Sequence, residues 1–235
     1  MSMAQAAIEI DGVSKAFTMH LQGGVRLPVF RDVSFCVAPS ECIVLGGPSG
    51  AGKSSLLKII YGSYRCDSGR IRVHRSGELI DMASAAPRRI IGLRRDTIGY
   101  VSQFLRVIPR VGALDIVSAA AAEAGWPKPA AHEHARALMT RLNLPERLWA
   151  LPPATFSGGE QQRVNIARGF AGRHRVLLLD EPTASLDAAN RAVVVELIKE
   201  KKAAGVALIG VFHDDDVRQP VADRVIDVTR FAPEG

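Results

Sequence analysis

A glycine-rich segment that ends in lysine and serine is the part of this chain best suited to hold phosphate. It fits the pattern G-x-x-x-x-G-K-[ST]. Its residues are Gly47, Pro48, Ser49, Gly50, Ala51, Gly52, Lys53 and Ser54. In this pattern backbone amides face the phosphate oxygens, the lysine reaches the β and γ phosphates, and the serine hydroxyl ligates magnesium. The segment lies between an apolar run at 42–45 and a helical run at 53–61, which favours a phosphate loop over an ordinary glycine turn.

Two carboxylates follow a second apolar run, at 176–179. Asp180 and Glu181 therefore stand where a buried strand leaves the core, at the edge where a parallel sheet presents its ligand crevice. Asp180 is suited to hold magnesium, and Glu181 to polarise or deprotonate a water molecule that attacks a phosphate. The simpler alternative is that these carboxylates are only solvated groups at the end of a strand. The presence of a phosphate loop in the same chain favours the role in phosphate chemistry.

A Ser-Gly-Gly segment precedes an amphipathic run at 160–170 and predicts a second helix start that faces an anion. The residues concerned are Ser157, Gly158, Gly159, Glu160 and Gln161. On chemistry alone, a serine N-cap followed by flexible glycines explains this segment better. The order of motifs along the chain changes that balance.

Further residues complete an ordered set. Gln103 follows a strand-like run at 97–102, His213 follows another at 206–212, and a Ser-Leu-Asp triplet follows the two carboxylates. The triplet is Ser185, Leu186 and Asp187. With the phosphate loop and the Ser-Gly-Gly segment, this set resembles the ATP-binding cassette (ABC) family across 8–228. In isolation, Gln103 and His213 are explained more simply as a solvated loop residue and the cap of a strand.

The resemblance implies a role for each motif, with ATP and Mg²⁺ as cofactors. Gln103 is expected to sense magnesium and a partner protein, and the triplet to be the D-loop. The expected catalytic residues are Glu181, His213 and Lys53. The expected magnesium ligands are Ser54, Gln103 and Asp180. Expected ATP-binding residues are Phe17, Gln103, Ser55 and the phosphate loop, whereas Ser157 to Gln161 form the signature loop that meets the ATP of a partner subunit.

Three positions depart from the usual family pattern. Phe17 stands where a tyrosine often stacks on adenine, and a phenylalanine ring can still stack; an aromatic core residue beside a strand is the alternative. Phe156 replaces the usual leucine before the signature serine, and Glu160 stands where glutamine is commonest. Both changes occur within the family, so activity is expected to be retained.

The alternation of strand-like and helical runs predicts an α/β fold with a parallel sheet. The family resemblance specifies this as the ABC type of P-loop NTPase fold. Its mostly parallel core sheet is accompanied by an N-terminal antiparallel β subdomain and a helical signature subdomain. We expect one ABC domain over 1–235, with the helical subdomain at roughly 104–160. The family also implies that two cassettes pair head to tail around ATP, as a homodimer or a heterodimer with a related ABC subunit.

Composition excludes several other classes. The net charge is +6, but the arginines are dispersed and no basic recognition helix or aromatic platform is evident, so no nucleic-acid partner is expected. No apolar run approaches the 18 residues or more that a membrane-spanning helix needs, and the first residues of the sequence do not show the basic region followed by an apolar core that is typical of a signal segment. The sequence therefore predicts a cytoplasmic protein without direct membrane insertion.

The partner system is suggested by the segment after Gln103, at 104–111, and by several other stretches. Together they resemble the cassette proteins of the carbon-phosphorus lyase system. This resemblance implies a role in phosphonate catabolism, supporting formation of ribose 1-phosphonate 5-triphosphate from ATP and an alkylphosphonate, with the soluble lyase core complex as partner. The alternatives are an ATPase subunit of an ABC membrane transporter, of the lipoprotein-release or export type, and a module in which ATP only closes the dimer.

Overall fold

The computed structural model describes residues 6–19, 23–75, 77–105 and 109–233. Its N-terminal part contains a four-stranded antiparallel sheet in the order β2-β1-β4-β5. The strands are β1 (Ile8–Met19), β2 (Val25–Val37), β4 (Ser68–Arg75) and β5 (Glu78–Asp81). β-Bulges interrupt both pairings of β1, so the sheet twists around the structures it covers.

A second sheet forms the centre of the molecule and has five strands in the order β6-β7-β8-β3-β9. Its strands are β3 (Cys42–Gly46), β6 (Ile98–Val101), β7 (Val176–Asp180), β8 (Ala207–Val211) and β9 (Arg224–Asp227). All four pairings are parallel. The carboxyl ends of β3 and β7 therefore lie at one edge, next to the phosphate loop and the two predicted carboxylates.

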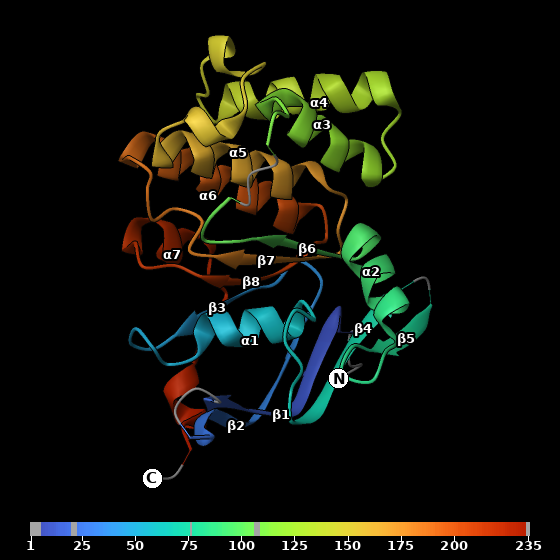
Figure 1. Ribbon diagram of the computed structural model, residues 1–235, viewed down its shortest axis with the longest axis vertical. Coiled ribbons are helices and arrows are strands. Elements are labelled where there is room, and N and C mark those ends of the chain that lie inside the picture. Colours follow the sequence, from blue (N-terminus) through green and yellow to red (C-terminus); the bar gives the residue numbers. More distant parts are fainter. Residues whose placement is uncertain (1–5, 20–22, 76, 106–108, 234–235) are drawn as a thin grey trace.

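Helices cover both faces of the parallel sheet (Figure 1). They are α1 (Lys53–Ile60), α2 (Pro87–Asp96), α3 (Ala113–Glu123), α4 (Lys128–Arg141), α5 (Gly158–Ala171), α6 (Ala188–Ala203) and α7 (Asp215–Val221). Short 3-10 turns lie at Glu146–Leu148, Pro153–Thr155 and Val228–Phe231. Figure 1 shows α5 and α6 on one face, with α3 and α4 beyond them, and α1 on the other face.

The two faces of the sheet bury two separate apolar clusters. Along β7, Leu177 and Leu179 contribute to the cluster with α5 and α6, whereas Val176 and Leu178 contribute to the cluster with α1 and the antiparallel sheet. This alternation follows from the two-residue period of a strand, and both faces are apolar because both are covered. The predicted α/β architecture, with its antiparallel sheet and its helical part, is confirmed.

No helix within the described ranges combines the length and the apolar character that a membrane crossing requires.

Phe170, near the end of α5, is expected to contribute strongly to stability. Its side chain is 1% exposed and packs in the cluster between α5, α6 and the sheet. Replacing it with alanine should lower the free energy of unfolding by about 3–5 kcal/mol, because a large cavity is left in a close-packed core. Urea unfolding measures this change. The control is Arg168→Ala on the exposed side of the same helix, which should alter stability by less than about 0.5 kcal/mol.

Candidate functional site

The phosphate loop joins the end of β3 to the start of α1. Lys53, the first residue of α1, is only 7% exposed, and its Nζ donates to the carbonyls of Gly47 and Pro48, both at 2.7 Å. The ammonium group is therefore held within the loop. No side chain caps α1 and its first turn carries no acidic residue, so its amides and its dipole favour an anion.

Gly52 is required at the end of this loop. Its φ of 93° lies in the left-handed region, and a Cβ there would come within 2.5 Å of the Val29 side chain on β2. A larger residue is therefore excluded by both backbone strain and contact. The antiparallel sheet thus packs directly against the phosphate loop. Ser55, the remaining predicted binding residue of this segment, is half-buried in α1.

Asp180, at the end of β7, contacts both the phosphate loop and the neighbouring strand β6. Its side chain is 2% exposed; Oδ1 accepts a 2.7 Å hydrogen bond from Ser54 Oγ, and Oδ2 accepts one of 2.7 Å from the Tyr100 hydroxyl. Burial, and then the hydrogen bond to Asp180, raise the pKa of Tyr100, so the phenol is a donor at neutral pH. The hydroxyl and carboxylate oxygens at this point fit magnesium, which is commonly held by one or two carboxylates and by substrate phosphates.

Glu181 is brought together with two other predicted residues. His213 Nε2 lies 2.8 Å from its Oε1, and Gln103 Nε2 donates to its Oε2 at 3.0 Å. Glu181 itself has a φ of 50°, a left-handed conformation that is uncommon outside glycine and recurs at functional sites. The three side chains come from the ends of β7, β8 and β6, three adjacent strands of the parallel sheet.

The signature residues form the start of α5 as a capping box. Ser157 caps the helix, its hydroxyl accepting from the Glu160 amide at 3.4 Å, while the Glu160 carboxylate accepts from the Ser157 amide at 2.8 Å. The side-chain hydrogen bond from Ser157 is the main reason that the pKa of Glu160 is lowered. The glutamate found in place of the usual glutamine is therefore explained locally, because a carboxylate completes this cap. Gln161 donates to the Phe156 carbonyl at 3.0 Å.

Helix α5 connects the signature loop to the other motifs of its own chain. Gln162 donates to the carbonyl of Pro182, next to Glu181, at 2.8 Å, and Asn165 donates to the carbonyl of Ser102, next to Gln103. The phosphate loop, by contrast, begins α1 on the opposite face of the sheet (Figure 1). In the described chain no hydrogen bond joins the phosphate loop to the signature residues.

The D-loop triplet lies beside the signature loop. The Ser185 carbonyl would be 3.0 Å from a Cβ placed on Gly159, so the two backbones approach closely. Leu186 is 7% exposed and packs in the core, and Asp187 caps α6 by accepting from the Asn190 amide at 2.8 Å. Leu186 and Asp187 therefore also stabilise the fold of their own chain.

Phe17 is half-buried near the end of β1. It pairs with Leu27 on β2, two residues from Val29, whose side chain packs on the phosphate loop. The edge of its ring meets Tyr64, with centroids 5.5 Å apart. The structure therefore places this aromatic at the phosphate-loop end of the antiparallel sheet.

Tyr100, Gln162 and Asn165 were not among the predicted site residues. Each is distant in sequence from its partner, for example by 80 residues for Tyr100 and Asp180. The available signal was the position of Tyr100 in the strand before Gln103, since neighbouring parallel strands place their ends together.

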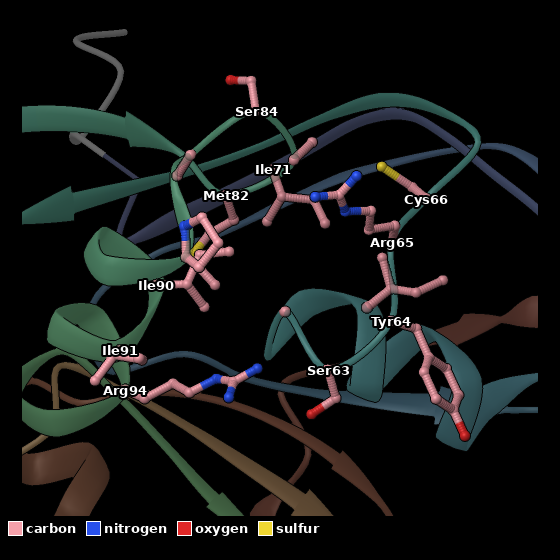
Figure 2. Close-up of a pocket in the computed structure, with 15 residues that line it drawn as sticks. Ser63, Tyr64, Arg65, Cys66, Ile71, Met82, Ser84, Ile90, Ile91 and Arg94 are labelled. Atoms are coloured by element: carbon pink, nitrogen blue, oxygen red, sulfur yellow. The ribbon is translucent and has the colours of Figure 1, made fainter.

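Two hollows lie on the side of the molecule near Gln103. One, of about 540 Å³, is lined among others by Gln103, Asp180, Asn165, Tyr64 and Phe104, and Phe104 is 74% exposed. The other, of about 580 Å³, lies between α2 and the segment that follows α1, with Ile71 and Met82 between them (Figure 2). None of the predicted site residues lines this second hollow.

Tyr100→Phe tests the importance of the hydrogen bond to Asp180. We expect the variant to need about 10- to 100-fold more Mg²⁺ for half-maximal ATP hydrolysis, because a hydrogen bond to a metal-binding carboxylate fixes the orientation of that carboxylate. The measurement is a magnesium titration of ATPase activity. Tyr64→Phe is the matched control, since Tyr64 lines the same hollow but has no bond to Asp180. Equal magnesium dependence in the two variants would contradict the assignment.

The loop between β3 and α1, with a buried carboxylate on a strand of the same sheet, defines the class of P-loop nucleotide hydrolases. The chain belongs to the ABC transporter family, whose model matches residues 30–184. It is similar to a dimeric structure of MJ0796, a bacterial ABC transporter cassette, with a TM-score of 0.83, 26% identity and 94% of each chain covered. A dimeric post-hydrolysis state of MJ0796 bound to ADP and Pi gives a TM-score of 0.81 at 26% identity, again with 94% of each chain covered.

Curated relatives include the lipoprotein-releasing system ATP-binding protein LolD of Maricaulis maris. It is 38% identical over 98% of this chain and 96% of LolD. The macrolide export ATP-binding/permease protein MacB of Chromobacterium violaceum is 35% identical over 96% of this chain. The chain spans only 34% of that MacB protein, about a third of its length.

The expected role in the carbon-phosphorus lyase system, based on a resemblance to its cassette protein PhnL, is wrong. The relatives above are transporter proteins, and the expected soluble lyase complex as a partner is therefore wrong as well. The resemblance rested on stretches such as 155–170, 177–198 and 210–214, which hold the α5 capping box, the buried strand β7 with its carboxylates, and His213. These positions serve the fold and the nucleotide site, so they carry little information about the partner. Of the partner-facing segment, residues 106–108 lie outside the described residues.

Proposed function

We propose that this chain is the ATPase subunit of an ABC membrane transporter of the lipoprotein-release or export type. The similarity to LolD over nearly the full length of both proteins supports this proposal most directly. The name of MacB refers to both an ATP-binding and a permease function, and this chain matches about a third of it. The chain then acts with a membrane-embedded partner, at the cytoplasmic side of the membrane where ATP is available.

ATP in this proposal lies along the phosphate loop. The amides of 47–55 and the Lys53 ammonium hold the phosphates, while Phe17 stacks on adenine. Ser54, Asp180 and the amide oxygen of Gln103 would hold magnesium, which on binding neutralises charge on the β and γ phosphates. The hydrogen bond between Ser54 and Asp180 supports this assignment, because it brings a hydroxyl and a carboxylate oxygen to one point beside the loop.

Glu181 is the proposed general base. Its carboxylate accepts a proton from the water molecule that attacks the γ phosphate in line with the leaving oxygen. His213 and Gln103 both contact this carboxylate and so fix its orientation. His213 is also proposed to contact the γ phosphate of bound ATP. Lys53 stabilises the charge that spreads over the phosphate oxygens in the transition state.

A second cassette completes the site. Helices α1 and α5 lie on opposite faces of the parallel sheet, so the phosphate loop and the signature loop of one chain are directed to different sides. Two copies, or this chain and a related cassette, therefore pair head to tail, and Ser157 to Gln161 of one meet the ATP held by the other. The D-loop, 185–187, lies against the signature loop and belongs to the same interface.

The proposed domain organisation is a single ABC domain over 1–235. Its helical subdomain, at roughly 104–160, contains α3 and α4 and leads into the signature loop. The segment after Gln103 begins this subdomain.

The membrane partner is proposed to dock in the hollow beside Gln103. Phe104 lines this hollow and is 74% exposed, as is expected of an aromatic anchor at an interface. Gln103 itself donates to Glu181, so movement of a docked element reaches the proposed base through one side chain. This chain of contacts gives the partner a physical route to the rate of hydrolysis.

Affinity capture from detergent-solubilised membranes tests the proposal. The tagged chain should recover an integral membrane protein, and Phe104→Asp should reduce the recovery by about tenfold or more while ATP binding is retained, because a charge replaces an apolar anchor. Leu79→Asp is the matched control, since Leu79 is 46% exposed on β5 and does not line the hollow. Recovery of no membrane protein, or equal loss with both variants, would contradict the proposed docking.

A further inference from the structure

A third hollow lies at the opposite edge of the parallel sheet, where β7 begins. Its volume is about 770 Å³, within the range of small-molecule sites. The loop at 172–175, the end of α6 and β4 enclose it. Its charged and titratable lining residues are His74, Arg173, His174, Arg175 and Lys201, and no acidic side chain is among the lining residues.

The two arginines of this hollow have no carboxylate partner among the described residues. Arg175 makes no side-chain hydrogen bond or ion pair in the described part of the chain, and the Arg173 guanidinium lies over the Trp126 ring at 3.9 Å. Glu200, next to Lys201, is bonded instead to Arg141 through both carboxylate oxygens. Positive charge is therefore concentrated around a hollow that contains no counter-charge of its own.

Helix ends explain only part of this cluster. Lys201 donates to the carbonyl of Gly172 at 2.7 Å and so offsets the negative end of α5, while backbone groups of Arg94 and Arg95 at the end of α2 bond to His174. Arg173 and Arg175 have no such role. Burial lowers the pKa of Lys201, so an anion close to its ammonium group would be favoured.

We propose that this hollow is a binding site for a small phosphate-bearing anion. Arg175 and Arg173 offer planar guanidinium groups, which suit phosphate oxygens, and Lys201 adds a point charge. The site lies at the far ends of two functional elements, because α5 begins at the signature loop and β7 ends at Asp180. The phosphate group comes from a free metabolite or from a lipid headgroup, and the two sources are distinguished experimentally.

Trp126 provides a local reporter. The chain contains two tryptophans, so in a Trp149→Phe background the emission of Trp126 alone follows changes at Arg173. With the phosphate loop saturated by ADP and magnesium, titration with sodium phosphate or pyrophosphate should change this emission saturably. Arg175→Gln should weaken the apparent affinity by about tenfold, the amount that corresponds to loss of one charge-assisted hydrogen bond.

Arg88→Gln is the matched control, since it removes the same charge from an exposed position on α2. Cosedimentation with phosphatidylglycerol vesicles forms the second arm. A response to phosphate or to vesicles that is lost in Arg175→Gln and kept in Arg88→Gln supports the site, and the arm that responds identifies the source. No response in either arm, or equal responses in both variants, would overturn the proposal.

Discussion

Replacing Glu181 with glutamine is expected to lower the rate of ATP hydrolysis by about 10²- to 10⁴-fold, the contribution typical of a general base. Glutamine keeps the size of the side chain but cannot accept a proton from water. ATP binding should be retained, because Lys53 and the loop amides are unchanged and Glu181 contacts only His213 and Gln103 among the predicted site residues. Steady-state phosphate release and binding of a fluorescent ATP analogue measure the two quantities.

Glu196→Gln is the matched control for this change. Glu196 is exposed on α6, pairs with Lys199 and contacts none of the proposed site residues, so turnover should stay at the wild-type rate. If Glu181→Gln also hydrolyses ATP at the wild-type rate, Glu181 is not the base. If ATP only closes the dimer, the wild-type chain itself has negligible turnover. Glu181→Gln would then also leave the rate unchanged.

Gly158→Asp is expected to reduce turnover by about 10²- to 10³-fold, the loss seen when one group that stabilises transition-state charge is removed. Gly158 is exposed, its φ is outside the left-handed region, and a Cβ there would meet no atom within 4 Å. The fold should therefore accept the substitution. The new carboxylate, however, would repel the γ phosphate of ATP held by the partner chain.

Gly158→Ala separates charge from size, since it adds a Cβ without a carboxylate. ATPase assays of both variants, with circular dichroism to confirm folding, complete the comparison. Activity should be much higher in Gly158→Ala than in Gly158→Asp. A wild-type rate in Gly158→Asp would show that the signature loop does not lie against bound ATP.

Much of the fold could be predicted because its periodicity is local. The apolar run at 176–179 corresponds to β7, the run at 206–212 to β8, and the amphipathic run at 160–170 to α5. Each is buried or amphipathic along its whole length. Strand β5 and helix α2 were not predicted, because β5 is short and only Leu93 of α2 is buried, so neither carries a strong pattern.

The site was predictable as a set of residues but not as a set of contacts. Gly52, Lys53 and Ser54 are consecutive in the chain, so the motif predicts their relative positions in the loop. The bonds from Tyr100 to Asp180 and from Gln103 to Glu181 cross 80 and 78 residues, and they exist only because β6 and β7 pair in the parallel sheet. No local pattern reports such pairs.

The partner was the least predictable feature. Strong similarity in buried strands and capping motifs reflects packing and phosphate chemistry, which all cassettes share. An exposed residue such as Phe104 is free of those constraints and is where partner choice is expected to be encoded.

The mass of the Glu181→Gln chain in solution, measured by light scattering with and without ATP and magnesium, tests the head-to-tail ATP site most directly. We predict the mass of one chain without nucleotide and of two chains with it, because unhydrolysed ATP holds the two signature loops in place. Adding Gly158→Asp to the same chain should restore the mass of one chain. A Glu181→Gln chain that binds ATP stoichiometrically yet keeps the mass of one chain at every protein concentration would contradict an ATP site completed by a second copy of this chain.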